Sequence, residues 1–287
     1  MRNTVAENAE WIASIIHRYL DDPKKHAIAP SLSEPAFGEP LIGFGNGKDP
    51  VFRQLKKLIG PFYWTPEEIF RLTFPGDKHP ADPLSVISWI LPQTEATKKD
   101  SRRCKKYPSR RWTFVRLHGE NVNARLRKHL TDTLRRKGFP AVAPMLSPLW
   151  QREHSHAFGL ASSWSERHTA YACGLGTFGL SDGLITPKGK AVRIGSVVAR
   201  IELSPSPRPY RDHNAYCLYH ARGKCGKCVK RCPAGAISLN GHDKEKCKRY
   251  IRAVTAPYAR ARQTGVKVNS CGLCQTGVPC ESAIPVK

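Results

Sequence analysis

Residues 217–233 read CLYHARGKCGKCVKRCP, and residues 271–280 read CGLCQTGVPC. Together with Cys247, these stretches hold eight of the ten cysteines, all within the last 71 residues of a 287-residue chain. A C-x2-C-x3-C run that ends in Cys-Pro is typical of a bacterial ferredoxin, where four thiolates hold each cube and the last cysteine of the run binds the other cube. The spacing therefore predicts two [4Fe–4S] clusters and a protein that moves electrons.

The crossed ferredoxin arrangement divides the eight cysteines into two sets of four. Two spacings depart from a standard ferredoxin: seven residues separate Cys217 from Cys225, and Cys280 is followed by Glu281 instead of proline. A longer loop adds little closure entropy, so we keep Cys217 and Cys280 as ligands, although they are the less regular members. The first cysteine set is Cys217, Cys225, Cys228 and Cys280, and the second cysteine set is Cys232, Cys247, Cys271 and Cys274.

Structural zinc and disulfide bonds are the alternative uses of these cysteines. Two C-x2-C pairs, at residues 225–228 and 271–274, would supply four zinc thiolates. However, 42 residues separate the pairs, against roughly 15–20 in a zinc ribbon. A disulfide framework requires export, and the N-terminus carries charges where a signal peptide has an apolar run. Of the cysteines outside both sets, we expect Cys104 to be a surface thiol and Cys173 a helix-packing residue.

The composition is that of a globular protein with a large basic excess. Forty-seven Lys and Arg face 23 Asp and Glu, which gives a formal charge of +24, and the mean hydropathy is −0.45. No apolar stretch approaches the roughly 20 residues that cross a bilayer, so we expect a cytoplasmic protein without membrane association. Residues 97–137 hold fifteen Lys/Arg and three Asp/Glu. Such density favours a polyanionic partner, either tRNA or an acidic electron donor of ferredoxin or flavodoxin type; a merely solvated basic surface is the alternative.

Hydrophobic periodicity and capping signals predict an α+β fold. We expect three regions: a helical region packing on the core (1–80), an α+β catalytic domain (81–208) and a double-cluster domain (209–287). The expected elements are helices at 9–20, from Asp49 to Gly60, from Thr65 and at 121–137, a buried strand at 84–91, a basic loop at 97–111, loop-rich sequence at 139–164, a helix opened by a Ser163/Glu166 capping box, strands at 183–186 and 192–203, and a linker at 205–209.

Gly174-x-Gly176-x-x-Gly179 matches the letters of the dinucleotide-binding fingerprint. That motif requires a strand before the glycines and a helix after them, whereas here we expect a helix before and a strand after. Glycines at this density leave room for the backbone to approach a flat or bulky ligand. The alternative is a tight helix-to-strand turn that binds nothing.

The segment 166–203, followed by a linker and the double-cluster module, resembles the epoxyqueuosine reductases and their relatives, the reductive dehalogenases. The resemblance covers roughly residues 80–287. It implies a nitroreductase-like domain that holds a cobalamin, and a ferredoxin-like domain whose two [4Fe–4S] clusters reduce the cobalt. By match to the family's loop, the residues near the corrin would be Gly174, Gly176, Thr177, Phe178, Gly179 and Ser181.

Two departures put epoxyqueuosine itself in doubt as the substrate. Where the family has Gly-Lys-Asn after the loop aromatic, this chain continues Gly179-Leu180-Ser181. Where the family has a Gly-Arg-Asp-Tyr-His segment, this chain has Gly119–Asn123, so Asn121 occupies the place of the proposed proton-donating aspartate. Glu120 is adjacent and would serve as the acid if burial raised its pKa. The alternative for Glu120 and Asn121 is a helix N-cap.

Reductive dehalogenases usually carry a twin-arginine signal, which this N-terminus lacks, and we place no equivalent of their catalytic tyrosine. His154 and His156 lie in a polar stretch and are expected to face solvent. The sequence therefore predicts an iron–sulfur oxidoreductase that uses a cobamide on an undetermined substrate. The alternatives are an electron-transfer activator of a partner corrinoid protein and a tRNA-binding module with structural clusters.

Overall fold

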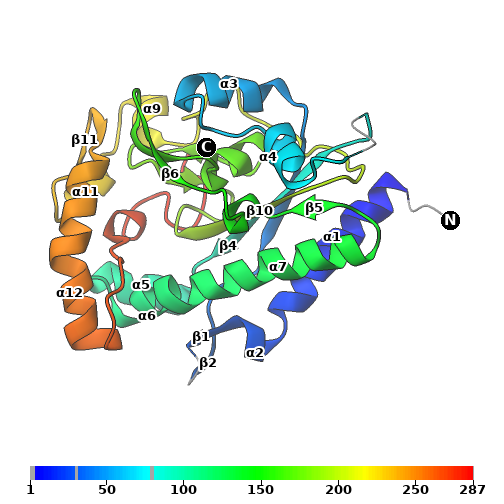
Figure 1. Ribbon diagram of the computed structural model, residues 1–287. Coiled ribbons are helices and arrows are strands. Elements are labelled where there is room, and N and C mark those ends of the chain that lie inside the picture. Colours follow the sequence, from blue (N-terminus) through cyan, green and yellow to red (C-terminus); the bar gives the residue numbers. More distant parts are fainter. Residues whose placement is uncertain (1–3, 30–31, 78–80, 287) are drawn as a thin grey trace.

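A four-stranded antiparallel sheet lies at the centre of the computed structural model, which describes residues 4–29, 32–77 and 81–286 (Figure 1). β4 pairs with β10 along its whole length, from Pro92 opposite Val192 to Ser85 opposite Ala199. β5 pairs only with the last two residues of β10, so in the described ranges no strand covers the rest of that edge. In order across the sheet, the strands are β3 (Leu41–Asn46), β4 (Ser85–Pro92), β10 (Val192–Ala199) and β5 (Ala141–Val142).

Helices cover both faces of this sheet because side chains alternate along each strand. Ile87 and Trp89 of β4 pack on one face with apolar residues of α1 and α7. Val86 and Ile90 pack on the other face with residues of α3, α4 and α8. The expected mixed helix-and-strand fold is thus confirmed. The bounds of these helices are α1 (Val5–Leu20), α3 (Pro50–Ile59), α4 (Pro66–Thr73), α7 (Glu120–Arg136) and α8 (Glu166–Ala172).

Two N-terminal helices, α3 and α4, begin where their capping signals predict, whereas α1 begins at Val5, before the expected residue 9. Asp49 accepts a hydrogen bond from the amide of Val51 at the start of α3, and Gly60 follows its last residue. Thr65 and Glu68 form a reciprocal capping box at α4. However, the region 1–80 is more than a helical layer on the core, because β3 is a strand of the central sheet. The region's other elements are α2 (Pro23–His26), β1 (Ala27–Ala29) and β2 (Leu32–Pro35).

The basic segment 97–111, expected as a loop, is largely helical. It contains most of α5 (Glu95–Arg103) and the start of α6 (Arg110–Phe114). Thr94 and Ser109 cap these helices by accepting hydrogen bonds from Thr97 and Trp112 amides, a signal that the charge run obscured.

The helix expected to begin at residue 121 begins much earlier. α6 continues through a π-helical turn (Val115–Gly119) directly into α7. Gly119 already has right-handed helical dihedrals, φ −66° and ψ −28°. The interpretation of Glu120 and Asn121 as a helix N-cap is therefore wrong, because an N-cap residue has an extended backbone.

Between α7 and β10 the chain is more regular than expected. The stretch 139–164 contains β5 and an antiparallel hairpin as well as a short 3-10 helix. Ser165, rather than Ser163, is the N-cap of α8, so the predicted capping box is wrong. β10 ends at Ala199, before the expected 203. The remaining elements here are the 3-10 helix (Pro144–Leu146), β6 (Arg152–Ser155), β7 (Gly159–Ser162), β8 (Thr177–Phe178) and β9 (Leu184–Ile185).

The cysteine-rich C-terminal region packs against the end of the molecule formed by α5 and α6 (Figure 1). The expected linker at 205–209 has no regular structure but is well packed, since Ser206 exchanges hydrogen bonds with Phe44 of β3. The C-terminal elements are α9 (Leu218–Arg222), α10 (Lys227–Lys230), β11 (Ile237–Ser238), β12 (Gly241–His242), α11 (Lys244–Tyr250), a π turn (Ile251–Thr255), α12 (Ala256–Ala259), a second π turn (Arg260–Thr264) and a 3-10 turn (Leu273–Gln275).

Among the helices of the described ranges, none combines the length and apolar character needed to cross a membrane.

Candidate functional site

The four members of the first cysteine set line one cavity. Gly179 and Leu180 of the glycine-rich loop, and Lys190, line the same cavity. Burial raises the pKa of the Cys228 thiol, and the neighbouring Cys217 and Cys225 raise it further, against the opposing effect of Lys190. The structure therefore brings these thiols together beside the glycine-rich loop. The cavity-lining members are Cys217, Cys225, Cys228 and Cys280.

The second cysteine set gathers in the same way. Burial raises the pKa of Cys274 to about 12, and its thiol neighbours Cys271, Cys247 and Cys232 add to the shift. Burial also raises the pKa of Cys271 to about 11, again with Cys247 and Cys232 as neighbours. The thiols that influence Cys271 and Cys274 therefore belong to the second cysteine set, which is the grouping that the crossed ferredoxin arrangement predicts.

This donor set fits two cubane clusters better than one zinc ion. Within the described residues, no three His, Cys, Asp or Glu side chains converge on a single metal ion. A cube distributes its four thiolates over separate iron atoms, so its ligands need not converge on one point. The two pairs that a zinc site would combine, 225/228 and 271/274, fall into different groups of neighbours.

Two arginines fasten the cysteine-rich region to α5. Arg231, just before Cys232, donates hydrogen bonds to the carbonyl oxygens of Ser101 and Cys104 at 3.0 and 2.8 Å. Arg102 of α5 forms an ion pair with Glu281, whose side chain is almost completely buried. The glutamate that replaces the usual proline after the last cysteine therefore docks the module. Part of the basic segment expected to face a polyanion makes intramolecular contacts instead.

The glycines of the loop are required by the packing of the chain itself. The order of elements is as expected, with α8 before the loop and β9 after it, although two residues of the loop itself form β8. Gly174 has a φ of +79°, and a Cβ there would lie 2.3 Å from the carbonyl oxygen of Pro207. A Cβ on Gly176 would lie 2.2 Å from the carbonyl oxygen of Ile185. Their lack of a side chain is therefore needed whether or not a ligand approaches.

The polar groups expected near a corrin are engaged within the protein. Thr177 Oγ1 accepts a hydrogen bond from the Tyr216 amide at 2.9 Å. Ser181 Oγ accepts one from Lys190 Nζ at 3.0 Å, and Gly179 is buried. Phe178 is partly exposed, with its ring centroid 4.9 Å from that of His168. What this loop offers a flat ligand is therefore an aromatic surface and backbone rather than polar side chains.

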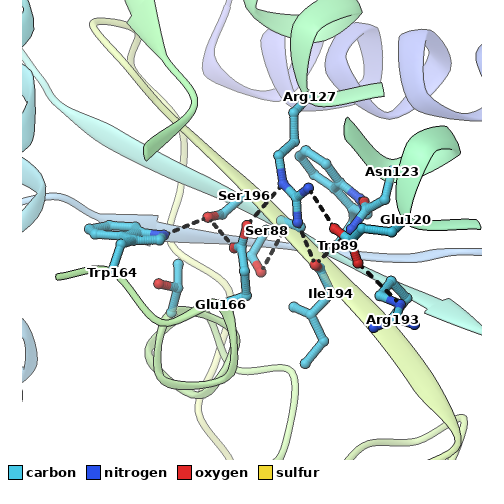
Figure 2. Close-up of polar contacts among 12 residues, drawn as sticks. Ser88, Trp89, Glu120, Asn123, Arg127, Trp164, Glu166, Arg193, Ile194 and Ser196 are labelled. Atoms are coloured by element: carbon cyan, nitrogen blue, oxygen red, sulfur yellow. Dashed lines mark hydrogen bonds and ion pairs between the residues drawn. The ribbon is translucent and has the colours of Figure 1, made fainter. Parts of the chain in front are cut away.

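A buried polar network spans the edge of β10 that β5 leaves uncovered (Figure 2). Arg127, 2% exposed, extends from α7 and donates from Nε to Glu166 of α8 at 3.0 Å. Its Nη2 donates to the carbonyl oxygen of Ile194 at 3.0 Å, and Asn123 Nδ2 donates to the same oxygen at 2.9 Å. Ser196 of β10 donates its hydroxyl to Glu166. Arg127 and Asn123 thus satisfy the Ile194 carbonyl at this edge in place of a neighbouring strand.

Glu120 lies at the other end of this network, among three arginines. Its carboxylate oxygens lie 3.2 Å from Arg127 Nη1, 3.5 Å from Arg116 Nη1 and 3.4 Å from Arg193 Nε. Glu120 therefore forms ion pairs with three arginines. This role differs from that of the proton donor that the sequence suggested. Asn121, the other predicted catalytic residue, is exposed.

Two titratable side chains at this site, Glu166 and His168, are not marked as functional by any sequence motif. Burial raises the pKa of Glu166, while Arg127 and the Ser196 hydroxyl oppose the shift. Burial lowers the pKa of His168 to about 3, so the imidazole is neutral, and its Nδ1 lies 2.8 Å from Ser165 Oγ. Exposed His154 and His156 confirm the expectation that they face solvent.

A sequence signal for this network exists along α7. Asn123, Arg127 and Thr131 recur every fourth residue beside the apolar stripe, and all three are buried. Residues four apart lie on one face of a helix. This spacing marks a polar stripe that faces the core.

Comparisons with known proteins confirm the resemblance seen in the sequence. No protein-family model matches the chain. Epoxyqueuosine reductase of Francisella cf. novicida (strain Fx1) is 30% identical over 126 residues, which are 42% of this chain and 33% of that protein. A crystal structure of selenomethionine-labelled epoxyqueuosine reductase superposes with a TM-score of 0.50 and 17% identity, over 97% of this chain and 66% of that chain.

A catabolic reductive dehalogenase, N-terminally tagged, has the same TM-score of 0.50 at 15% identity, over 86% of this chain and 30% of that chain. At these identities the solved structures show a shared fold. The matched part is a third of the curated relative and just under two thirds of the reductase structure. The chain thus has the fold of the epoxyqueuosine reductases and reductive dehalogenases.

Proposed function

We propose that this chain is an iron–sulfur oxidoreductase of the epoxyqueuosine-reductase-like class, with two [4Fe–4S] clusters and a cobamide, acting on an undetermined substrate. The observation that carries the proposal is the gathering of eight thiols into two groups of four, one of which shares a cavity with the glycine-rich loop. When bound, the clusters supply one-electron chemistry and the corrin supplies a reducible cobalt. The resemblance to epoxyqueuosine reductase supports the choice of class.

The protein's own residues would hold these groups and keep water from them. The two cysteine sets would ligate the clusters, and Arg231 and Arg102 would hold the module against α5. For the corrin, the resemblance supports the glycine-rich loop, and the partly exposed Phe178 supports contact with a flat ring system. The nitroreductase-like and ferredoxin-like division at about residue 208 belongs to the same proposal.

For the proton that a reduction consumes, we propose Glu166 rather than Glu120 as the holder. The side chain of Glu166 is only 11% exposed, its pKa is raised by burial, and the Ser196 hydroxyl contacts its carboxylate. A general acid that works near neutral pH needs such a raised pKa. Glu120 would instead orient Arg116 and Arg193.

We propose an acidic ferredoxin- or flavodoxin-type protein as the electron donor. Cys225 is the exposed member of the first cysteine set, and Lys224 and Lys227 beside it are exposed. Opposite charge steers such encounters and makes them sensitive to salt. In a Lys224→Glu/Lys227→Glu variant, reduction by an acidic flavodoxin should slow about tenfold, as expected for rim charges. Retention of the rate, together with loss of binding to a tRNA stem-loop, would assign this surface to RNA instead.

Metal and cofactor analysis of anaerobically isolated protein tests the proposal. We expect about eight iron and eight sulfide per chain, as two cubes require, and stoichiometric corrinoid when cobamide is available during expression. Cys228→Ser should lose about half of the iron, since the other cube keeps its four ligands. Cys104→Ser is the matched control, because Cys104 lies outside both sets, and it should keep the full content. Zinc in place of iron would refute the cluster assignment, and absence of corrinoid would refute the cobamide.

A further inference from the structure

Lys190 is a buried lysine that lies against the first cysteine set. It is 3% exposed and follows the tight turn at Thr186–Gly189, between β9 and β10. Its backbone amide donates to the carbonyl oxygen of Cys280 at 2.8 Å. Its side chain lines the cavity that the four cysteines of that set also line. Both its backbone and its side chain are thus placed by the cysteine-rich region.

The turn that carries Lys190 is fixed against the chain at Cys280. Gly189 has a φ of +80°, and a Cβ there would lie 2.1 Å from the carbonyl oxygen of Glu281. Ala191 donates its amide to the same carbonyl oxygen at 3.3 Å. Because backbone holds the turn on both sides of residue 190, the ammonium has little freedom to move away from the thiols.

The groups that face the ammonium are a hydroxyl and four thiols. Nζ donates to Ser181 Oγ at 3.0 Å, and none of the ion pairs found in the described ranges gives Lys190 a carboxylate partner. Three of these thiols, Cys280, Cys228 and Cys217, belong to the first set, and Cys274 belongs to the second.

A buried ammonium needs an anionic partner because desolvation of an unpaired charge is expensive. A thiolate-ligated [4Fe–4S] group is such an anion, and reduction adds one electron to it. A fixed positive charge nearby therefore stabilises the reduced form more than the oxidised form. Net charge and hydrogen bonding around the sulfurs are among the factors that set the potentials of such clusters.

We propose that Lys190 is the buried counter-charge of the iron–sulfur group at the first cysteine set and raises the reduction potential of that group. This inference rests on the proposed function, because it presumes that both sets hold clusters. It makes Lys190 a tuning residue that neither ligates iron nor touches the substrate. The same charge ties the cysteine-rich region to the glycine-rich loop, through Ser181.

Redox titration of the iron-loaded full chain, followed by electron paramagnetic resonance, tests the inference. In Lys190→Met, the ratio of reduced to oxidised first cluster at a fixed potential should fall about tenfold, which for one electron is a midpoint about 59 mV more negative. Lys190→Arg should keep the potential near that of the wild type. Lys188→Met is the matched control: it removes a lysine two residues away that pairs with Glu39 at the surface, and it should leave both midpoints unchanged.

The first cluster is identified as the one whose electron paramagnetic resonance signal is absent from the Cys228→Ser variant. If Lys190→Met does not fold, Lys190→Gln removes the charge while keeping a donor for Ser181, and the same shift is expected. Unchanged midpoints in a fully loaded neutral variant would overturn the inference, as would an equal shift in Lys188→Met or a larger shift in the second cluster. Protein that contains no iron would instead contradict the proposed function.

Discussion

The cysteine-rich region and the polar network at β10 both bury charged groups, but they assemble them in opposite ways. In the cysteine-rich region, thiols from one stretch of about 70 residues surround a single lysine. In the network, α7, α8 and β10 each contribute charged or polar side chains, and arginines outnumber the carboxylates that join them. The first arrangement depends on loops that hold ligands, whereas the second depends on how helices pack on a sheet.

The largest effect should come from removing the arginine that joins the two helices of the network. Arg127→Met leaves Glu166 without its cation and removes one of the two side-chain donors to the Ile194 carbonyl, the other being Asn123. Breaking a buried pair in this way costs about 3–5 kcal/mol of unfolding free energy. Urea unfolding followed by circular dichroism measures the loss. Arg125→Met, on an exposed face of the same helix, is the control and should lose under about 1 kcal/mol; equal losses would show that the network does not stabilise the fold.

A smaller loss is expected from the arginine that fastens the cysteine-rich region to α5. Arg231→Met removes charge-assisted hydrogen bonds to the carbonyl oxygens of Ser101 and Cys104. Such bonds contribute about 1.5–3 kcal/mol each, but the carbonyls gain access to water in the variant, so we expect a total loss of about 2 kcal/mol.

Hydrogen exchange locates the effect of Arg231→Met. Faster exchange should be confined to residues 217–286 and α5, whereas the β4–β10 pairing should keep its protection. The exposed neighbour provides the control, as Lys230→Met should leave exchange unchanged. Uniform loss of protection throughout the chain would show that the two regions unfold as one unit.

Stability should also depend on pH through His168, which lies on α8 as Glu166 does. Its pKa in the folded protein is about 3, below the ordinary value of 6.5, because of burial and the nearby Arg167 and Lys244. The folded protein binds this proton less readily than the unfolded chain, so the contribution of His168 is present above pH 6.5 and is lost as pH falls toward 3. At about 1.4 kcal/mol per unit, and allowing for partial exposure, the loss between pH 7 and 5 is about 1 kcal/mol.

His168→Gln isolates this contribution, because glutamine does not titrate. The difference in unfolding free energy between wild type and variant should shrink as the pH falls from 7 to 5. His156→Gln, an exposed control on the β6–β7 hairpin, should show no such convergence. A constant difference across this range would mean that His168 is not held neutral by its surroundings.

The contrast between the two regions also explains what could be read from the sequence. The cysteine sets were predictable because thiol spacing along one segment reflects the geometry of the group it would hold. The segment 97–111 was misread because its charges suggested a loop, while Thr94 and Ser109 supplied ordinary helix caps. Charged residues indicate which face of an element is exposed to water, whereas capping residues indicate where a helix begins.

The network was not predicted because no single segment contains it. Arg127 and Glu166 are 39 residues apart, and they meet only because β5 leaves an edge of β10 uncovered. The start of α7 was misplaced for a related reason, since a π-helical turn joins it to α6 without a cap. The role expected of Glu120 depended on its neighbours, and three arginines from three elements could not be placed beside it from the sequence.

The smallest expected effect distinguishes the two carboxylates of the network. Burial raises the folded-state pKa of Glu166, so the proton is held more tightly in the folded protein than in the unfolded chain. The contribution of that proton to stability is fully present below the ordinary carboxyl pKa of 4.5 and is lost as pH rises through the folded pKa. Relative to Glu166→Gln, the wild type should therefore gain stability as pH falls from 7 to 4.5. The gain is small because Arg127 opposes the shift. Glu120→Gln is the matched variant. If the difference in unfolding free energy from the wild type depends on pH for Glu120→Gln and not for Glu166→Gln, Glu120 holds the proton instead.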